Sequence, residues 1–110
     1  MEPAPFDMDV EDLARLRATG SPHRVLDVRE PWETEICGLP DALLIPLGML
    51  PGRLSEVPDD VPVIVLCHHG ARSARAVGLL RSRGFDGAVN LKGGIDAWAT
   101  RIDTTMARYD

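Results

Sequence analysis

The sequence predicts an α/β protein with a parallel sheet that helices cover on both faces. Short apolar segments alternate with helical patterns along the chain, which is the order typical of such a sheet. The 110 residues suffice for one modest hydrophobic core, so we expect a single domain over residues 1–110. With 45% hydrophobic and 26% charged residues, the composition is that of an ordinary soluble globular chain.

The first half of the chain contains two of the expected strands. We expect an irregular or short extended lead-in over residues 1–8 and a helix over 10–18. A strand over 24–28 and a short helix over 31–36 should follow. The last two elements of this half are a strand over 42–46 and a polar helical stretch over 47–56. Asp9 is placed to cap the first helix and Gly20 to end it. Pro31 suits the first position of the short helix, where its missing N–H costs nothing.

The second half contains the clearest strand, over residues 62–66. This segment is continuous, apolar and rich in β-branched residues, with a proline at its start and a glycine loop after it. Next we expect a helix over 72–83, a strand over 88–91 and a short helix that follows Gly93-Gly94 and contains Trp98 as a core anchor. The rest of the chain is expected to pack back as a surface segment.

Cys67 directly follows the 62–66 strand. In parallel sheets ligands bind beyond the carboxyl ends of the strands, so this thiol lies at the expected ligand-binding edge. The loop Cys67-His68-His69-Gly70-Ala71-Arg72-Ser73 joins this strand to a helix, so several main-chain N–H groups should converge above the sulfur. These donors and a nearby guanidinium favour the thiolate, which is the nucleophilic form of cysteine. We therefore expect Cys67 to be a catalytic nucleophile.

The other residues of the loop suit a small anionic substrate. Gly70 supplies the backbone freedom that a tight cradle needs, and Ala71 keeps the entrance clear of bulk. Arg72 offers planar charged donors for an oxyanion such as the sulfonate end of thiosulfate, its alternative role being an ion pair with an acid on the helix. Ser73 is placed to cap the following helix.

Three segments of this chain, in their order, resemble those of the rhodanese family, and of its single-domain bacterial members in particular. They are Asp27-Val28-Arg29-Glu30, Cys67-x-x-Gly70-x-Arg72-Ser73 and Leu91-x-Gly93-Gly94-Ile95-x-Ala97-Trp98. The resemblance covers about residues 8–100. It implies a three-layer fold, with a twisted sheet of about five parallel strands between helices. It also implies a sulfurtransferase that passes a sulfane sulfur from a donor to a thiophilic acceptor through a cysteine persulfide.

Two further segments bear on this resemblance. Family members usually show a Gly-His-Ile-x-Gly-Ala signature where this chain has Cys37-Gly38-Leu39-Pro40-Asp41-Ala42, which leaves the packing of residues 31–42 open. The tail from Trp98 to Tyr109 resembles the end of rhodanese modules fused to cofactor-sulfurating enzymes. That likeness implies a sulfur-carrier protein or another thiol as the acceptor.

Several other polar residues have a structural and a functional interpretation. His68 and His69 would add positive charge at mildly acidic pH if they bind substrate, but solvated loop residues are the commoner case. For Asp27 and Arg29 we favour a salt bridge at the strand edge over substrate contact. For Cys37 we favour an unreactive buried thiol over a disulfide partner of the persulfide.

Bulk properties exclude several classes of function. A formal charge of −5 and a pI of about 5.1 leave no broad basic face for nucleic acid. Two distant cysteines have no zinc-site spacing and fit a reducing cytoplasm, and no apolar stretch suits export or membrane insertion. We expect no metal and no organic cofactor.

Two alternatives to a sulfurtransferase remain open. Phosphatases and arsenate reductases use a similar cradle with five residues between cysteine and arginine, whereas four separate Cys67 from Arg72. The shorter ring should exclude a phosphoryl group. The second alternative is a docking or regulatory module that keeps the fold without turnover, and the presence of Cys67 argues against it.

Overall fold

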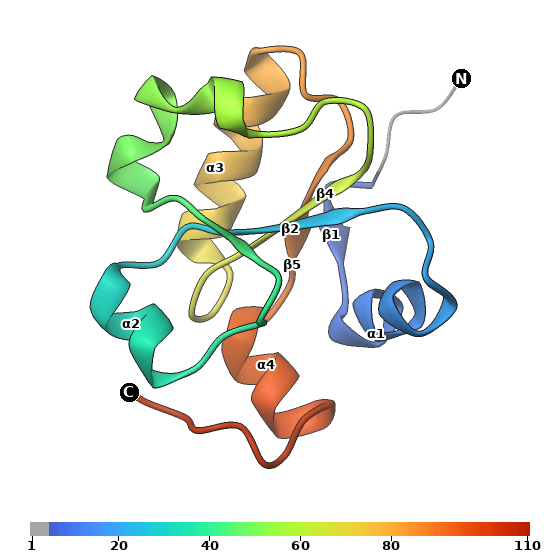
Figure 1. Cartoon of the computed structure of the whole chain (residues 1–110), viewed down its shortest axis with the longest axis vertical. Coiled ribbons are helices and arrows are strands. Elements are labelled where there is room, and N and C mark those ends of the chain that lie inside the picture. The colour runs from blue at the N-terminus through green and yellow to red at the C-terminus, as the bar shows by residue number, and fades with distance from the viewer. Residues whose placement is uncertain (1–4) are drawn as a thin grey trace.

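The computed structural model describes residues 5–110. The strands within this range are β1 (Asp7–Met8), β2 (Arg24–Asp27), β3 (Leu43–Leu44), β4 (Val63–Leu66) and β5 (Ala88–Leu91). The helices are α1 (Val10–Thr19), α2 (Pro31–Ile36), α3 (Ala71–Ser82) and α4 (Gly94–Arg101), with the 3-10 helices η1 (Leu47–Gly52) and η2 (Leu54–Glu56) between β3 and β4. The five strands form one sheet in the order β1-β5-β4-β2-β3, and every pair is parallel (Figure 1). The expected α/β fold is confirmed.

The central strand β4 sets the position of the candidate site. It pairs with β2 on one side and β5 on the other, so Val65 lies between Leu26 and Asn90. The same register places Asp27 beside Leu66, the residue before Cys67. The carboxyl ends of β2 and β4 therefore meet at one edge of the sheet, where Cys67 begins its loop.

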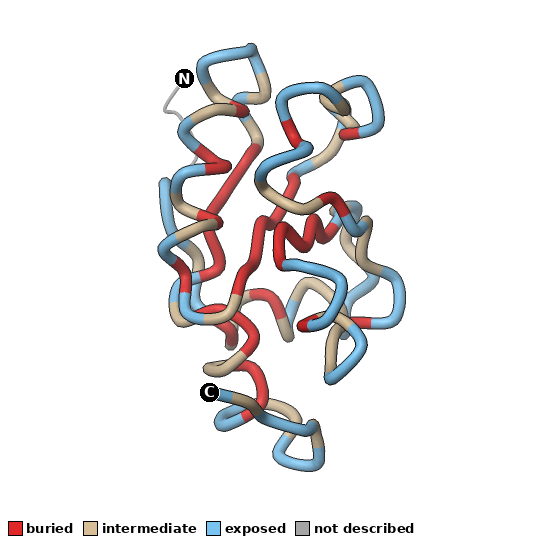
Figure 2. Tube along the Cα trace, turned by 90° about the vertical axis from the view of Figure 1, so that its left-hand side faces the viewer, coloured by how far each residue is buried: buried red, intermediate tan, exposed pale blue. Residues whose placement is uncertain are grey.

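Helices cover both faces of the sheet because the strand side chains alternate between two hydrophobic cores. Val25 and Ile64 belong to the core beneath α1 and α4, which also contains Trp98. Leu26 and Val65 belong to the core beneath α3, η1 and η2. The strands β4 and β5 are buried over their whole length, and β2 over all but its first residue (Figure 2). Trp98 is thus a core anchor, as expected.

Local signals placed the ends of α1 correctly. The Asp9 side chain accepts a hydrogen bond from the Asp12 N–H at 2.8 Å, which satisfies a free donor of the first turn. Gly20 closes the helix with a φ of 68°, a conformation that glycine adopts without a steric penalty.

Two segments differ from expectation. The 42–46 strand is reduced to β3, a two-residue edge strand. The stretch 47–56 forms two 3-10 helices with Pro51 inside the first, because proline lacks the N–H that a regular helix needs.

The short extended lead-in agrees with expectation where the structure describes it. It contributes β1, whose Asp7 pairs with Asn90 of β5. Residues 1–4 of the expected lead-in lie outside the described residues.

The segment after α4 returns toward the carboxyl edge of the sheet. Residues 102–110 pack back across α4, as expected, and the chain ends beside α2 (Figure 1). None of the helices formed within residues 5–110 has both the length and the apolar character needed to cross a bilayer.

Candidate active site

The sulfur of Cys67 lies within the turn that joins β4 to α3. The Gly70 N–H donates to Sγ at 3.1 Å, and the Ser73 hydroxyl oxygen lies 3.3 Å from the same atom. Cys67 is 1% exposed, so the sulfur is at the bottom of its cradle. Donors directed at a buried sulfur stabilise negative charge on it better than they would in water.

The N-terminus of α4 fixes the backbone of this loop. The Ile95 N–H donates to the Cys67 carbonyl at 2.9 Å, and the Asp96 N–H donates to the His68 carbonyl at 3.1 Å. Gly94 allows this approach, since a Cβ there would lie 2.5 Å from both carbonyl oxygens. The Gly93-Gly94 pair therefore matters for the shape of the cradle as well as for the turn.

Ser73 does not cap α3, so that prediction was wrong. The N-cap is Gly70, with a φ of 114°, and Ser73 lies one turn inside the helix. Its hydroxyl oxygen is within 3.2 Å of the Gly70 carbonyl and 2.5 Å of the Asn90 Oδ1. A hydroxyl has one proton, so the Cys67 sulfur and these two oxygens share a single donor.

Asn90 is a site residue that sequence reasoning missed. It is a buried amide within the otherwise apolar β5. Its Oδ1 faces Ser73, and its Nδ2 donates to the Asp7 carboxylate at 3.0 Å. A polar residue in a buried strand must find hydrogen-bond partners. The single polar residue in the apolar 88–91 segment was therefore the sequence signal that could have identified Asn90.

Arg72 forms an ion pair with Glu33 of α2, not with an acid on its own helix. Two parallel N–H···O bonds of 2.7 Å join the guanidinium to the carboxylate, whose side chain is 4% exposed. This pairing lowers the pKa of Glu33 from 4.5 to about 2. A guanidinium carries five N–H donors and the pair uses two, so substrate contact by Arg72 stays a prediction. Glu33 was not identified from the sequence.

The remaining loop residues occupy three different environments. The His68 ring is stacked on the Tyr109 ring, with a centroid separation of 4.0 Å, and is tilted by 33° against the His69 ring at 3.9 Å. Burial, followed by the charge of His69, lowers the pKa of His68, so the ring is neutral at pH 7. The His69 side chain is 67% exposed, 4.0 Å from the Asp96 carboxylate. Ala71 is exposed at the start of α3.

Asp27 and Arg29 form the expected salt bridge. Both side chains are fully buried, and the closest N···O distance is 2.7 Å. Arg29 also donates to the Cys37 carbonyl at 2.8 Å and to the Glu33 carbonyl at 3.3 Å. The pair therefore ties the end of β2 to the middle of α2 and to the residue that follows this helix.

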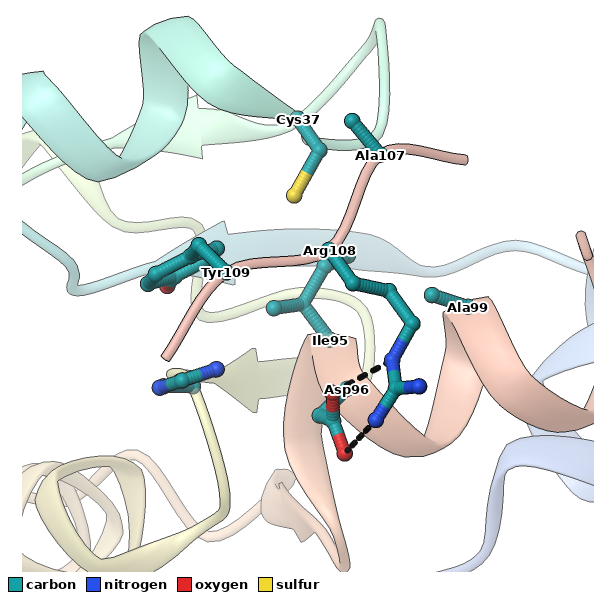
Figure 3. A pocket seen from close by; sticks show the side chains of 8 residues that line it. Cys37, Ile95, Asp96, Ala99, Ala107, Arg108 and Tyr109 are labelled. Carbon is teal, nitrogen blue, oxygen red and sulfur yellow. Dashed lines mark hydrogen bonds and ion pairs between the residues drawn. The ribbon is translucent and has the colours of Figure 1, made fainter. Parts of the chain in front are cut away.

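The Cys37 thiol lies in the seam between α2, α4 and the tail (Figure 3). It is half-buried, and its sulfur is 3.9 Å from a guanidinium nitrogen of Arg29. Its chemical role stays a prediction. Among the described residues, no three His, Cys, Asp or Glu side chains are grouped so that they could hold a metal ion.

Fold and site together define an α/β protein with a candidate cysteine nucleophile in a cradle of main-chain and hydroxyl donors. The family model of the rhodanese-like domain matches residues 9–101, and the chain belongs to this family. The family match, together with the similarity to a sulfurtransferase, identifies it as a rhodanese-like domain of the sulfurtransferase type.

Relatives and solved structures agree with this assignment. A sulfurtransferase of Allochromatium vinosum is 39% identical over 93 residues, covering 84% of this chain and 87% of that protein. The probable adenylyltransferase/sulfurtransferase MoeZ of Mycobacterium tuberculosis is 37% identical over 87 residues, covering 77% of this chain and only 22% of its own length. A rhodanese-like domain protein from Staphylococcus aureus superposes with a TM-score of 0.82 at 29% identity, covering 96% of this chain and 100% of that one. The human single-domain sulfurtransferase TSTD1 gives 0.78 at 26% identity, covering 89% and 98%.

Proposed function

We propose that this protein transfers a sulfane sulfur from thiosulfate, or from a persulfide donor, to a thiophilic acceptor through a persulfide on Cys67. The observation that carries the proposal is the sulfur of Cys67 with the Gly70 N–H at 3.1 Å and the Ser73 hydroxyl at 3.3 Å. Donors at these positions stabilise the attacking thiolate, and the same cradle would hold the negative terminal sulfur of the persulfide.

Each half-reaction is a displacement at sulfur. The Cys67 thiolate attacks the outer sulfur of thiosulfate, the S–S bond of thiosulfate breaks, and sulfite leaves with the bonding electron pair. Cyanide or a thiolate then attacks the terminal sulfur of the persulfide and releases the Cys67 thiolate. No electron acceptor is needed, because the transferred sulfur atom carries the oxidation equivalent.

Arg72 is proposed to receive the sulfonate end of thiosulfate. Its pair with Glu33 uses two N–H groups and fixes the plane of the guanidinium, which leaves the remaining donors for the anion.

For the acceptor we propose a thiol, and in particular a sulfur-carrier protein. Support comes from the similarity to MoeZ, whose name combines adenylyltransferase and sulfurtransferase. Because this chain spans about a fifth of that protein, the adenylyltransferase part lies outside the matched region. We propose a cytoplasmic location, since a reducing compartment keeps the thiol of Cys67 available.

The test is sulfur loading of the purified protein. Incubation with thiosulfate carrying labelled outer sulfur should add one sulfur atom to Cys67, detectable by mass spectrometry, and added cyanide should then remove it as thiocyanate. Cys67→Ser should abolish both steps, whereas Cys37→Ser is the matched control and should retain them. Failure of the wild-type protein to take up label from thiosulfate and from low-molecular-weight persulfides would refute the proposal. Hydrolysis of an aryl phosphate would instead favour the phosphatase class.

A further inference from the structure

The tail brings its side chains onto the candidate active site. Arg108 pairs with Asp96 of α4 through bonds of 3.0 and 3.3 Å, as Figure 3 shows. Cys37, Ile95 and Ala107 line the same seam as this pair (Figure 3). The space between these side chains does not admit a water molecule. The tail is therefore packed against the domain up to its penultimate residue.

That residue, Tyr109, places its ring between α2 and the cysteine loop. The ring is stacked on His68, with a centroid separation of 4.0 Å and an interplanar angle of 11°. The Tyr109 ring also meets the Trp32 ring of α2 in an edge-to-face contact, with a centroid separation of 5.7 Å and an interplanar angle of 76°. Stacking of two flat rings restrains both of them, so Tyr109 limits the motion of the loop residue next to Cys67.

The hydroxyl of Tyr109 joins the two ion pairs of the site. It donates to Glu33 Oε1 at 3.0 Å and accepts from Arg29 Nη1 at 3.2 Å. Glu33 holds Arg72, and Arg29 holds Asp27. The Tyr109 hydroxyl therefore links the buried Asp27–Arg29 pair to the guanidinium expected to bind substrate.

The Glu33 carboxylate has four hydrogen bonds in this arrangement. Arg72 donates two, the Glu30 N–H donates to Oε2 at 2.8 Å, and Tyr109 donates to Oε1. Four donors match the number of lone pairs that a carboxylate offers, so its orientation is fully determined. Because the pair with Arg72 is bidentate and planar, the orientation of Glu33 sets that of the guanidinium.

We propose that Tyr109 is a positioning residue for the anionic sulfur donor, acting through Glu33 on the orientation of Arg72. The inference rests on the proposed function and extends it to a residue outside the three family segments. Without the hydroxyl, Glu33 Oε1 loses one donor and the buried Arg29 guanidinium loses one of its acceptors. Glu33 and Arg72 then sample other orientations, and the anion is bound less well.

Tyr109→Phe tests this proposal, because it removes the hydroxyl and keeps the stacked ring. We expect KM for thiosulfate to rise about three- to tenfold, the size of one ordinary hydrogen bond, because Tyr109 acts on the anion only through Glu33 and Arg72; kcat should change little. The comparison donor is an alkyl persulfide, which has no sulfonate for Arg72 to bind: the Cys67 thiolate attacks its outer sulfur, the S–S bond breaks, and the alkyl thiol leaves with the proton. Transfer from this donor should keep its wild-type kcat/KM. Arg108→Gln is the matched control, because it breaks a different contact of the tail. This variant should keep the wild-type kcat/KM for both sulfur donors.

The ratio of kcat/KM for thiosulfate to that for the alkyl persulfide is the decisive quantity. It does not depend on the amount of folded protein, so it stays valid if Tyr109→Phe is less stable. A ratio equal to wild type overturns the inference, and so does an equal fall of the ratio in Arg108→Gln. If the wild-type protein accepts sulfur from neither donor, the proposed function fails. If it accepts sulfur and the ratio is unchanged in Tyr109→Phe, only the role of Tyr109 fails.

Discussion

Gly94→Ala should damage the cysteine loop although residue 94 lies well outside it in sequence. A Cβ at this position would lie 2.5 Å from the carbonyl oxygens of Cys67 and His68, and the φ of 63° is unfavourable for alanine. The backbone conformation costs about 1–2 kcal/mol. Overlap with backbone atoms adds about 1–3 kcal/mol, because a carbonyl held by a helix N-terminus cannot move aside like a side chain. The expected loss of unfolding free energy is therefore about 2–5 kcal/mol.

Gly20→Ala provides the matched control for this prediction. Gly20 has a φ of 68°, and no atom lies within 4 Å of the position that an added Cβ would take, so alanine there meets the backbone penalty alone. Urea unfolding of both variants gives the two free energies, and their difference isolates the clash with the loop. Sulfur loading of Cys67, measured by mass spectrometry, should fall in Gly94→Ala and stay at wild-type level in Gly20→Ala. Equal destabilisation of the two variants, with normal loading in both, would refute the close approach between α4 and the loop.

Two further predictions concern the polar groups of the site. Because the pKa of Glu33 is lowered from 4.5 to about 2, its contribution to stability is complete above pH 4.5 and is lost as the pH falls toward 2. In urea unfolding, the wild-type protein should lose roughly 3 kcal/mol of unfolding free energy across this interval. Glu33→Gln should lack that part of the pH dependence. Identical pH profiles of the unfolding free energy in the two proteins would contradict the strength of the pair with Arg72. Ser73→Ala should slow alkylation of Cys67 by iodoacetamide at pH 7 by up to about tenfold, since it removes the hydroxyl proton that the sulfur shares with the Gly70 carbonyl and Asn90 Oδ1 and leaves the Gly70 N–H as donor. Ser82→Ala, on the exposed side of the same helix, should react at the wild-type rate, and equal rates in all three proteins would exclude a role for the hydroxyl.

The predicted and observed elements agree best where local signals are strong. The bounds of α2 and β5 are those expected, and α1 and α3 differ by about one residue at their ends. Agreement is weakest over residues 42–56, where a short edge strand and two 3-10 helices replace the expected elements. Apolar residues in this stretch pack onto the α3 side of the sheet without a regular period, so tertiary packing overrides the local pattern.

The candidate site also contains some residues that the sequence predicts and others that it does not. Cys67 and the Gly70 cradle follow from a strand, a loop and a helix that are adjacent in sequence, and short-range geometry is enough to predict them. The partner of Arg72 is different, because 39 residues separate it from Glu33. From the sequence, other acids close to the end of β2, such as Asp27 and Glu30, were equally good candidates for the partner of Arg72. Only the packing position of α2 selects Glu33.

What the sequence determined by itself was the fold class, the order of the elements and the position of Cys67 at the carboxyl edge of the sheet. These follow from hydrophobic periodicity, helix caps and turn residues, all of which act over a few neighbouring residues. Only the tertiary structure decided that Asn90 faces Ser73 and that Tyr109 reaches Glu33, 76 residues away. The physical reason is that a buried polar group must find a partner, but strand register and helix packing determine which distant residue supplies it.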